Sequence, residues 1–243
     1  MPNPVKIQVR VESIQKIDES VYSVYMRPLT RKPRFYAGQF LHLALDTYDP
    51  TGGYWPESRV FSIASSPKSD LIQIVYSVKG VYTRRMEKEL PVTSELWLKF
   101  PYGHFIIPQF IDDGVSRIVI IAGGTGISPF LPFLNDSASS GVSVPVKLYW
   151  GAKSPEVFSI GEGIVSNTIP NLEHTLFCES ETYNKIERCR FGKICMDTIW
   201  KENGTDSGCK YFISGPPQMI QVFKKYLIER NVDENRIIVD DWE

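Results

Sequence analysis

The chain has 243 residues, of which 42% are hydrophobic and 23% charged, and its formal net charge is −1. That length suits two domains of about 100–150 residues. The near-neutral balance gives no electrostatic footprint for nucleic acid or for an anionic membrane surface. Its longest apolar run, residues 118–122, is far too short to cross a bilayer, and residues 1–6 lack the pattern of a signal peptide. We therefore expect a cytoplasmic protein with neither nucleic acid nor membrane as a partner.

The cysteines and histidines give no metal-binding pattern. The four cysteines, Cys178, Cys189, Cys195 and Cys209, form no Cys-x-x-Cys pair, and the three histidines stand far apart. The clustered spacing of a plant-type [2Fe–2S] centre is also missing. We expect no bound metal, and cysteines that are reduced and packed like small hydrophobic residues.

The first hundred residues predict β structure. Residues 6–14 and 20–26 alternate apolar and polar side chains with period two, which is typical of half-buried strands. Further short strands are predicted at 40–45, 71–78 and 94–100, with one helix at 83–90. Short strands at this spacing indicate a small antiparallel barrel or sandwich.

The pattern changes after Pro108. Residues 109–114 have the composition of a linker, and residues 117–122 then form an uninterrupted apolar strand, as in a parallel sheet buried on both faces. Strands are predicted at 145–150, 172–178, 210–214 and 236–240, and a helix with a one-sided apolar stripe at 217–230. Alternating strands and helices predict a doubly wound α/β domain.

A glycine-rich loop directly follows the first strand of this second domain. Residues 123–129 read Gly-Gly-Thr-Gly-Ile-Ser-Pro, so the backbone can turn sharply and approach a phosphate closely. Ser128 suits the N-cap and Pro129 the first position of a following helix, whose N–H groups would face an anion. The alternative is a tight strand–helix turn with no ligand.

A second loop lies in the β-rich half, at residues 80–85. Thr83 is expected to cap the helix, which places Arg84 and Arg85 at the positive end of its dipole. A bound anion would balance the two arginines. The alternative is that both point into solvent, and the loop alone does not decide between these interpretations.

A third segment, residues 59–67 with the sequence Arg-Val-Phe-Ser-Ile-Ala-Ser-Ser-Pro, resembles the flavin motif Arg-x-Tyr-Ser of the ferredoxin–NADP reductase family. Residues 36–40, 100–105 and 214–219 resemble further motifs of that family, in the same order. The resemblance covers essentially the whole chain. It implies an N-terminal antiparallel Greek-key β-barrel that binds FAD, over residues 1–110. A doubly wound parallel-sheet NAD(P)-binding domain would follow over residues 114–243.

The resemblance also implies roles for individual residues. FAD would be held by Arg59 on its pyrophosphate, Phe61 against its ring, Ser62 at its N5 atom, and Val60, Tyr76, Ser77, Gly80, Val81, Tyr82 and Thr83. The nicotinamide nucleotide would be held by Gly124, Thr125, Gly126, Pro129, Lys153, Gly215, Pro216 and Met219. The implied catalytic residues are Ser62, Ser214 and Asp240.

Two positions depart from the family pattern. Phe61 replaces a tyrosine, which keeps the aromatic ring and loses one hydrogen bond of about 1 kcal/mol. Without the neighbouring motif, Phe61 would be taken for a core aromatic residue of a strand. Ser214 replaces a cysteine beside the nicotinamide, so hydride transfer is expected to be slower.

The C-terminus carries an acidic residue two positions before an aromatic one, Asp240 and Trp242. Family members often end in this way, with the aromatic residue over the flavin. Trp242 either stacks on the flavin and moves aside for nicotinamide, or packs on its own domain.

The choice of nucleotide depends on two strand ends. Lys153 could pair with a 2′-phosphate, whereas Glu179 and Glu181 stand where NADPH-specific relatives tend to carry arginine. A carboxylate accepts hydrogen bonds from ribose hydroxyls and repels a 2′-phosphate, which favours NADH over NADPH.

The sequence therefore predicts a reductase that moves a hydride from NAD(P)H to FAD and passes the electrons to a separate iron–sulfur or other redox protein, such as an oxygenase component. Nicotinamide C4 would meet flavin N5 between the domains, with the chemistry supplied by the cofactor. One alternative is an NAD(P)H:flavin reductase that acts on free flavin. Another, of a different class, is a nucleotide-binding electron-transfer or sensor subunit.

Overall fold

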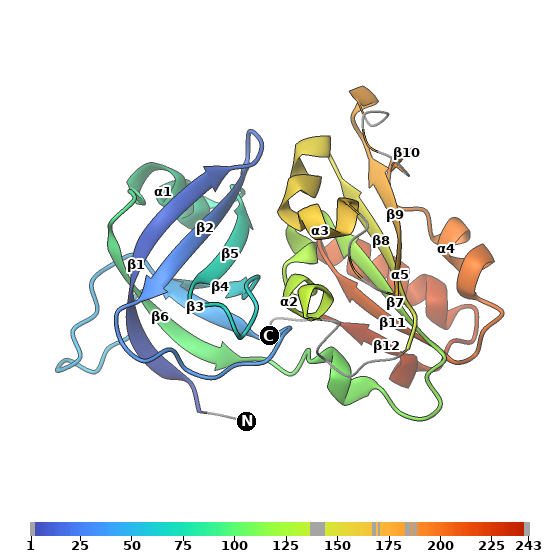
Figure 1. The fold of residues 1–243 in the computed structure, drawn as a ribbon, viewed down its shortest axis with the longest axis horizontal. Coiled ribbons are helices and arrows are strands. Elements are labelled where there is room, and N and C mark those ends of the chain that lie inside the picture. Colours follow the sequence, from blue (N-terminus) through green and yellow to red (C-terminus); the bar gives the residue numbers. More distant parts are fainter. Residues whose placement is uncertain are drawn as a thin grey trace. The chain divides into compact units, whose positions relative to one another are not determined.

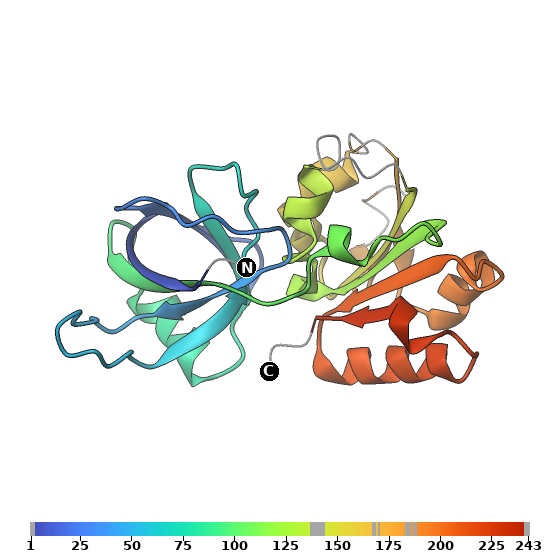
Figure 2. The same cartoon turned by 90° about the horizontal axis from the view of Figure 1, so that it is seen from below.

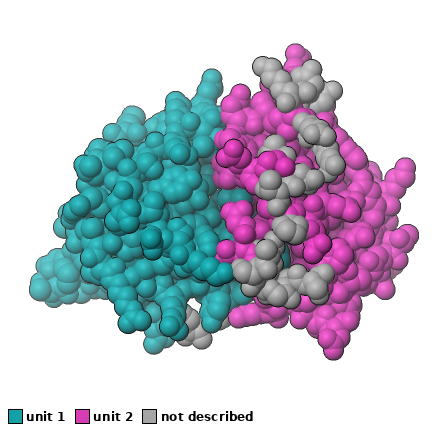
Figure 3. Space-filling model, in the orientation of Figure 1, with its two compact units in different colours: residues 1–106, 128–133 teal, residues 107–127, 134–243 magenta. Residues whose placement is uncertain are grey.

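The computed structural model describes residues 3–136, 144–166, 169, 171–182, 186 and 189–240. The chain forms two compact units, coloured separately in Figure 3. Unit 1 comprises Met1–Ile106 and Ser128–Phe133, and unit 2 comprises Ile107–Ile127 and Leu134–Glu243. Each unit has its own cluster of buried apolar side chains.

Unit 1 is built on an antiparallel sheet whose six strands run in the order β4-β3-β6-β1-β2-β5 (Figure 1). The strands are β1 (Val5–Lys16), β2 (Val21–Pro28), β3 (Phe40–Ala44), β4 (Ser58–Ser62), β5 (Ile72–Ser77) and β6 (Glu95–Tyr102). In β1 the alternating residues Ile7, Val9 and Val11 are buried, as the period-two pattern requires. Strand β6 returns to lie between β3 and β1, as in a Greek key.

The two edge strands of this sheet, β4 and β5, meet just beyond β4. The Ala64 N–H donates to the Gln73 carbonyl at 2.8 Å, and the Gln73 N–H donates to the Ser65 hydroxyl at 3.0 Å. These bonds turn the sheet into a nearly closed barrel, which confirms the predicted barrel. We call the line along which β4 and β5 approach each other the seam.

Helix α1 (Val81–Glu89) follows β5 and begins two residues earlier than predicted. The expectation that Thr83 caps the helix holds, although it does so from position N3 of a capping box, because Gly80 is the N-cap residue. The Thr83 hydroxyl still serves the helix start, since it accepts from the N–H groups of Lys79 at 2.9 Å and Gly80 at 3.1 Å. Tyr82 and Met86 are the buried side chains of this helix.

Unit 2 contains a parallel sheet in the order β10-β9-β8-β7-β11-β12. Its strands are β7 (Arg117–Gly123), β8 (Val146–Ala152), β9 (Leu172–Cys178), β10 (Cys189–Phe191), β11 (Cys209–Ser214) and β12 (Ile237–Val239). The five interior residues of β7, 118–122, are fully buried, as expected for a strand covered on both faces. The predicted doubly wound parallel sheet is confirmed.

The helical segments after α1 are α2 (Leu131–Asn135), α3 (Glu162–Val165), α4 (Met196–Asn203) and α5 (Pro217–Ile228), with 3₁₀ turns at Ile107–Phe110, Gly124–Ile127, Pro155–Gly161 and Glu234–Arg236. Helices lie on both faces of the sheet of unit 2, with α4 and α5 on one side and α3 on the other (Figure 2). No helix in the described part of the chain is long and apolar enough to cross a membrane.

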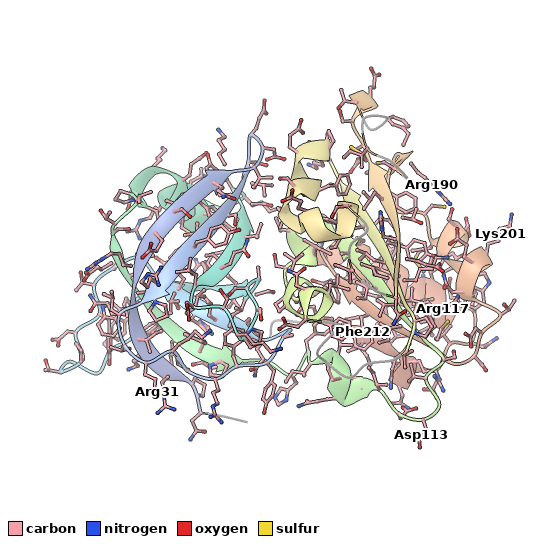
Figure 4. All side chains as sticks on the ribbon, in the orientation of Figure 1. Arg31, Asp113, Arg117, Arg190, Lys201 and Phe212 are labelled. Carbon is pink, nitrogen blue, oxygen red and sulfur yellow. The ribbon has the colours of Figure 1, made fainter. Side chains whose placement is uncertain are left out.

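The segment predicted to be a plain linker is packed onto β11. The Lys210 ammonium donates to the Phe110 carbonyl at 2.5 Å and lies 3.3 Å from the Asp112 carboxylate. The Phe110 ring meets the ring of Phe212, labelled in Figure 4, edge-on at 5.9 Å. These contacts hold the entry to unit 2 against its central strands.

A glycine before β3 offers a test of the barrel packing. At Gly38 a Cβ would lie 1.7 Å from the Phe105 carbonyl oxygen, and φ is +94°. Gly53 shares the positive φ, at +70°, but a Cβ there would meet nothing within 4 Å. We expect Gly53→Ala to cost about 1–2 kcal/mol of unfolding free energy through backbone strain alone. Gly38→Ala should cost about 1–3 kcal/mol more, because a backbone carbonyl must move.

Denaturant unfolding of both variants at one temperature measures this difference. Equal losses of unfolding free energy in the two variants would show that the Phe105 backbone can move away from the new Cβ at no cost.

Candidate functional site

The motif residues of unit 1 gather along the seam. Strand β4 carries residues 59–62, and β5 ends with Tyr76 and Ser77, from which the chain enters α1 at Gly80. The Arg59 guanidinium carbon lies 5.0 Å from the centre of the Tyr82 ring, which joins β4 to the first turn of α1. Residues about twenty positions apart in sequence thus form one cluster.

Arg59 is the exposed cation of this cluster, with 51% of its side chain accessible. Its guanidinium donates to the Glu57 carboxylate at 2.9 Å and to the Ser58 carbonyl at 2.9 Å. A guanidinium has five N–H donors in a planar fork, so two bonds leave donors for an anion. Arg59 is therefore available to bind phosphate oxygens.

Phe61 is buried, with 6% exposure, and belongs to the barrel core. Its ring meets Tyr76 edge-on, with centroids 6.2 Å apart, and Tyr76 stacks on Tyr22 at 5.5 Å. Burial raises the pKa of Tyr76, with smaller contributions from Tyr22 and Glu87. This packing is that of a core aromatic residue, and the interpretation that Phe61 also contacts a flavin stays a prediction.

Ser62 ends β4 with a buried hydroxyl. The residue is 4% exposed, and its Oγ has no hydrogen-bond partner among the described residues. A buried hydroxyl left unpaired costs about 1–3 kcal/mol, so such an atom calls for an explanation. A ligand with a polar edge, such as a flavin ring, would supply the missing partner.

The start of α1 suits an anion. The N–H groups of Val81, Tyr82 and Thr83 have no acceptor within the helix, and the first turn holds no acidic residue. Val81 is 73% exposed, and a Cβ built on Gly80 would meet nothing within 4 Å, so the backbone there is open. A phosphate group would find unpaired donors and the positive end of the dipole.

The two arginines of this turn differ. Arg85 pairs with Asp46 at 2.8 Å and with Glu89 at 3.1 Å, and its hydrogen bond holds the pKa of Asp46 below the usual range. Arg84 is exposed. The interpretation that both arginines point into solvent does not hold for Arg85, which pairs with the protein's own carboxylates. The interpretation that an anion binds at this turn stays a prediction.

In unit 2, the residues of two predicted motifs meet at the carboxyl ends of β7 and β11. A Cβ on Gly126 would lie 2.5 Å from the Ser214 carbonyl oxygen, and one on Gly123 would lie 2.7 Å from the Met219 sulfur. Gly215 has a φ of +151°, and a Cβ there would lie 3.0 Å from the Gly123 nitrogen. Larger residues would not fit.

This place is also where the strand order reverses, with β8 and β9 on one side of β7, and β11 and β12 on the other. Ligands of open α/β sheets bind in the crevice outside such a switch point. Thr125 lies in the same 3₁₀ turn, Gly124–Ile127, and the Trp150 indole N–H donates to the Gly124 carbonyl at 3.0 Å. The glycine loop is therefore held by a hydrogen bond from β8. Pro216, the N-cap residue of α5, borders the loop, since a Cβ on Gly123 would lie 2.9 Å from it.

Two of the predicted catalytic residues form a buried pair in unit 2. The Ser214 hydroxyl donates to the Asp240 carboxylate at 2.9 Å, and the residues are 3% and 8% exposed. The Asp240 N–H donates to the Ile213 carbonyl at 2.9 Å, which holds the carboxylate at the end of β11. The arrangement fixes the direction of the serine O–H bond.

Lys153 and Glu179 follow β8 and β9 at the same edge of the sheet, and both are exposed. The Glu179 N–H donates to the Ala152 carbonyl at 3.1 Å, so the two strand ends are adjacent. The Glu179 carboxylate lies 3.8 Å from the Lys193 ammonium. Glu181 is also exposed.

One expected helix start does not fit this geometry, and the roles of Pro129 and Trp242 stay predictions. The helix expected to start at Ser128–Pro129 begins at Leu131, because the glycine loop first makes a 3₁₀ turn and residues 128–130 continue as a turn. Pro129 lies in the segment Ser128–Phe133, which belongs to unit 1. Trp242 lies outside the described residues, so its role stays a prediction.

Three contributors were missed from the sequence. Gly123 approaches Met219, Trp150 holds the glycine loop, and Glu57 pairs with Arg59. The double glycine and the acidic residue two positions before Arg59 could have indicated Gly123 and Glu57. Nothing in the sequence marks Trp150, which reads as an ordinary strand residue.

The cysteines are only partly as expected. Cys178 and Cys209 are buried, and burial raises the pKa of Cys189 to about 11. Cys195 is exposed at the N-cap of α4, where hydrogen bonds from Thr198 lower its pKa, so the expectation that all four are packed inside is wrong. Within the described ranges, no cluster of three or more potential metal ligands occurs.

Comparison with known proteins agrees with this architecture. Residues 120–225 match the oxidoreductase NAD-binding domain family. The chain is 23% identical over 248 residues to the reductase component of propane 2-monooxygenase from Mycolicibacterium smegmatis, covering 97% of this chain and 67% of that protein. It is 22% identical over 227 residues to a probable flavin reductase of Vibrio harveyi, covering 90% of this chain and 91% of the relative.

Solved structures share the fold at low sequence identity. The cytochrome P450 reductase GcoB of Amycolatopsis superposes with a TM-score of 0.79 at 20% identity, over 98% of this chain and 70% of that one. A ferredoxin NADP+ reductase from Neisseria gonorrhoeae, solved with FAD and NADP, gives a TM-score of 0.74 at 16% identity, over 98% of both chains.

The unpaired hydroxyl of Ser62 predicts an unusual pattern of stability in the flavin-free protein. Ser62→Ala should change the unfolding free energy by less than about 0.5 kcal/mol, or raise it, because no hydrogen bond is lost. Ser23→Ala is the matched control, since Ser23 is equally buried but accepts from the Gln73 amide at 2.9 Å. That variant should lose about 1 kcal/mol.

Denaturant titration of both flavin-free variants gives the comparison. A loss at Ser62 as large as that at Ser23 would mean that the Ser62 hydroxyl already has a partner in the flavin-free protein.

Proposed function

We propose that this chain, which belongs to the ferredoxin–NADP reductase type of flavoprotein oxidoreductases, binds FAD in a barrel domain of residues 1–110 and a nicotinamide nucleotide in an α/β domain of residues 114–243. FAD, when bound, would accept a hydride from NAD(P)H and release the electrons to a separate acceptor. The chain's own residues bind, orient and shield the reacting groups.

The observation that carries the FAD proposal is the seam of unit 1. One exposed guanidinium, one open helix N-terminus and one unpaired buried hydroxyl occur together there, on Arg59, residues 80–83 and Ser62. The first two suit a pyrophosphate and the third suits the polar edge of a flavin ring. The donor set therefore fits FAD.

The nucleotide proposal rests on the glycine crevice of unit 2. Gly123, Gly126 and Gly215 let the backbone approach a ligand closely, and the Ser214–Asp240 pair lies at the same strand end. With its O–H directed at Asp240, the serine presents its lone pairs elsewhere and can accept from the carboxamide of a nicotinamide. Its role is to orient the ring, because it has no proton to give without breaking that bond.

The acceptor is proposed to be a separate redox protein. The relative from M. smegmatis is the reductase component of a propane monooxygenase, which supports a protein acceptor such as an oxygenase component. The Vibrio harveyi relative, a probable flavin reductase, spans nearly the same length as this chain and supports free flavin as the second candidate.

One absorbance spectrum, recorded before and after anaerobic NADH, tests the function. A yellow protein that retains flavin through gel filtration and bleaches with NADH is the expected result. A colourless protein that oxidises NADH only when free flavin is added would favour the flavin-reductase candidate. A protein inert in both assays would leave only a nucleotide-binding subunit.

Arg59→Ala tests the pyrophosphate assignment. Loss of charge-assisted bonds to phosphate should weaken FAD binding by about 10–100-fold, since each is worth about 1.5–3 kcal/mol. Arg10→Ala is the matched control, because Arg10 is also 51% exposed and also pairs with a carboxylate, Glu95, at 2.9 Å. Flavin content after gel filtration and a fluorescence titration measure the effect, and a normal flavin content in Arg59→Ala would reject this role.

For the nucleotide, we propose NADH as the preferred donor, because the Glu179 carboxylate would repel a 2′-phosphate. Glu179→Gln removes that charge and releases Lys193, now 3.8 Å from the carboxylate, to bind the phosphate. The ratio of kcat/KM for NADPH to that for NADH should rise about tenfold, which corresponds to about 1.4 kcal/mol. Glu173→Gln, at the other end of β9, should leave the ratio unchanged. An equal ratio in both variants would contradict the assignment.

A further inference from the structure

We infer that Tyr82 is a positioning residue that holds the Arg59 guanidinium in place for the phosphate groups of FAD. This inference rests on the proposed function. It assigns a role to the tyrosine ring, which is distinct from any role of the backbone of residues 80–83 in binding phosphate.

The ring is not itself a ligand-binding surface. Tyr82 is 3% exposed and belongs to the barrel core, although it is the second residue of the open helix turn. The group that reaches solvent is the guanidinium of Arg59, whose carbon lies 5.0 Å from the centre of the ring. That distance is within the range of a cation–π contact.

The ring is held at its far end by the strand next to β4. The Tyr82 hydroxyl donates to the Leu43 carbonyl at 2.5 Å and accepts from the Leu45 N–H at 3.1 Å. Leu43 is the residue opposite Arg59 in the β3–β4 ladder. Leu43 therefore pairs with the backbone of Arg59 and also accepts the hydrogen bond of the Tyr82 ring on which the Arg59 side chain lies.

The hydroxyl is a weak acid in this environment. The pKa of Tyr82 is raised to about 12, chiefly by burial, with Asp46 adding to the rise and the Leu45 N–H, Arg59 and Arg85 opposing it. Both hydrogen bonds therefore persist across the working pH range. The ring does not change position through titration.

Arg59 needs such support for two reasons. Its carboxylate partner, Glu57, forms an exposed ion pair of the kind that contributes little, and its remaining bond is to the carbonyl of the adjacent Ser58. It also has to remain near the first turn of α1, where the positive end of the helix dipole repels a cation. An aromatic face attracts the guanidinium without using any of its N–H donors, which stay available for phosphate oxygens.

Tyr82 therefore connects the two groups of donors that a phosphate would use, the helix N–H groups and the Arg59 guanidinium. Tyr82 supplies a first-turn N–H through its backbone and the platform for Arg59 through its ring. A pyrophosphate would therefore meet a guanidinium and helix N–H groups whose relative position is set within a single residue.

A double-mutant cycle on FAD affinity tests the inference. Tyr82→Leu should weaken FAD binding about tenfold, through loss of the platform, and Tyr82→Phe about two- to threefold, because the ring remains but its anchoring is lost. In the Arg59→Ala background, Tyr82→Leu should have no further effect, because there is no guanidinium left to position. Fluorescence titration of the flavin-free proteins gives the four dissociation constants.

Riboflavin has no phosphate, so its dissociation constant should change only if a variant damages the fold in general. Its affinity should be equal in the wild type, Tyr82→Phe and Tyr82→Leu. Parallel losses for FAD and riboflavin, or full additivity with Arg59→Ala, would overturn the inference and leave Tyr82 a core residue only.

The two proposals fail in different ways. A wild-type protein that binds no FAD would refute the proposed function and the inference with it. A wild-type protein that binds FAD, with unchanged affinity in the Tyr82 variants, would refute the inference alone. Should Tyr82→Leu not fold, Tyr82→Phe retains the ring volume, and an unchanged FAD dissociation constant in that variant would still contradict the anchoring argument.

Discussion

The hydrogen bond from the Ala64 N–H to the Gln73 carbonyl closes the barrel of unit 1, and the cluster along the seam depends on it. It brings together two edge strands that lie at opposite ends of the sheet order. Because β4 and β5 meet just past Ser62, their motif residues flank the line of approach and the start of α1 follows directly. A sheet that remained open would hold β4, which carries Arg59, apart from β5 and from the helix α1 that follows it.

In unit 2 the motif residues are brought together by close backbone contacts at glycines, whereas in unit 1 side chains make the contacts. Gly126 approaches the Ser214 carbonyl so closely that no Cβ fits, and Gly215 needs a positive φ to pass Gly123. The backbone around these glycines is therefore closely packed, and two polar side chains at the same strand ends, Ser214 and Asp240, are hydrogen-bonded to each other. Both units therefore present their polar groups from rigid strand ends, which is what positions a ligand without a large reorganisation.

Much of the fold could be predicted because its patterns are local. Alternation marked β1, an unbroken apolar run marked β7, and glycines marked both loops. Helix starts were less predictable: Ser128 and Pro129 have good capping chemistry, yet the loop continues through a 3₁₀ turn before α2. The pairing of Ser214 with Asp240, and of Tyr82 with Leu43, joins residues 26 and 39 positions apart. Such contacts depend on tertiary packing, which no single segment encodes.

The serine at position 214 also bears on chemical durability. Flavins that have been reduced generate peroxide when they meet oxygen, and peroxide converts accessible thiolates stepwise to sulfenic and sulfinic acids. A hydroxyl hydrogen-bonded to Asp240 cannot enter that sequence. Met219, which lies against Gly123 and Gly215, does carry an oxidisable sulfur, and its sulfoxide can be reduced again enzymatically. With serine at position 214, peroxide formed at a reduced flavin would find no thiol at the end of β11 to oxidise.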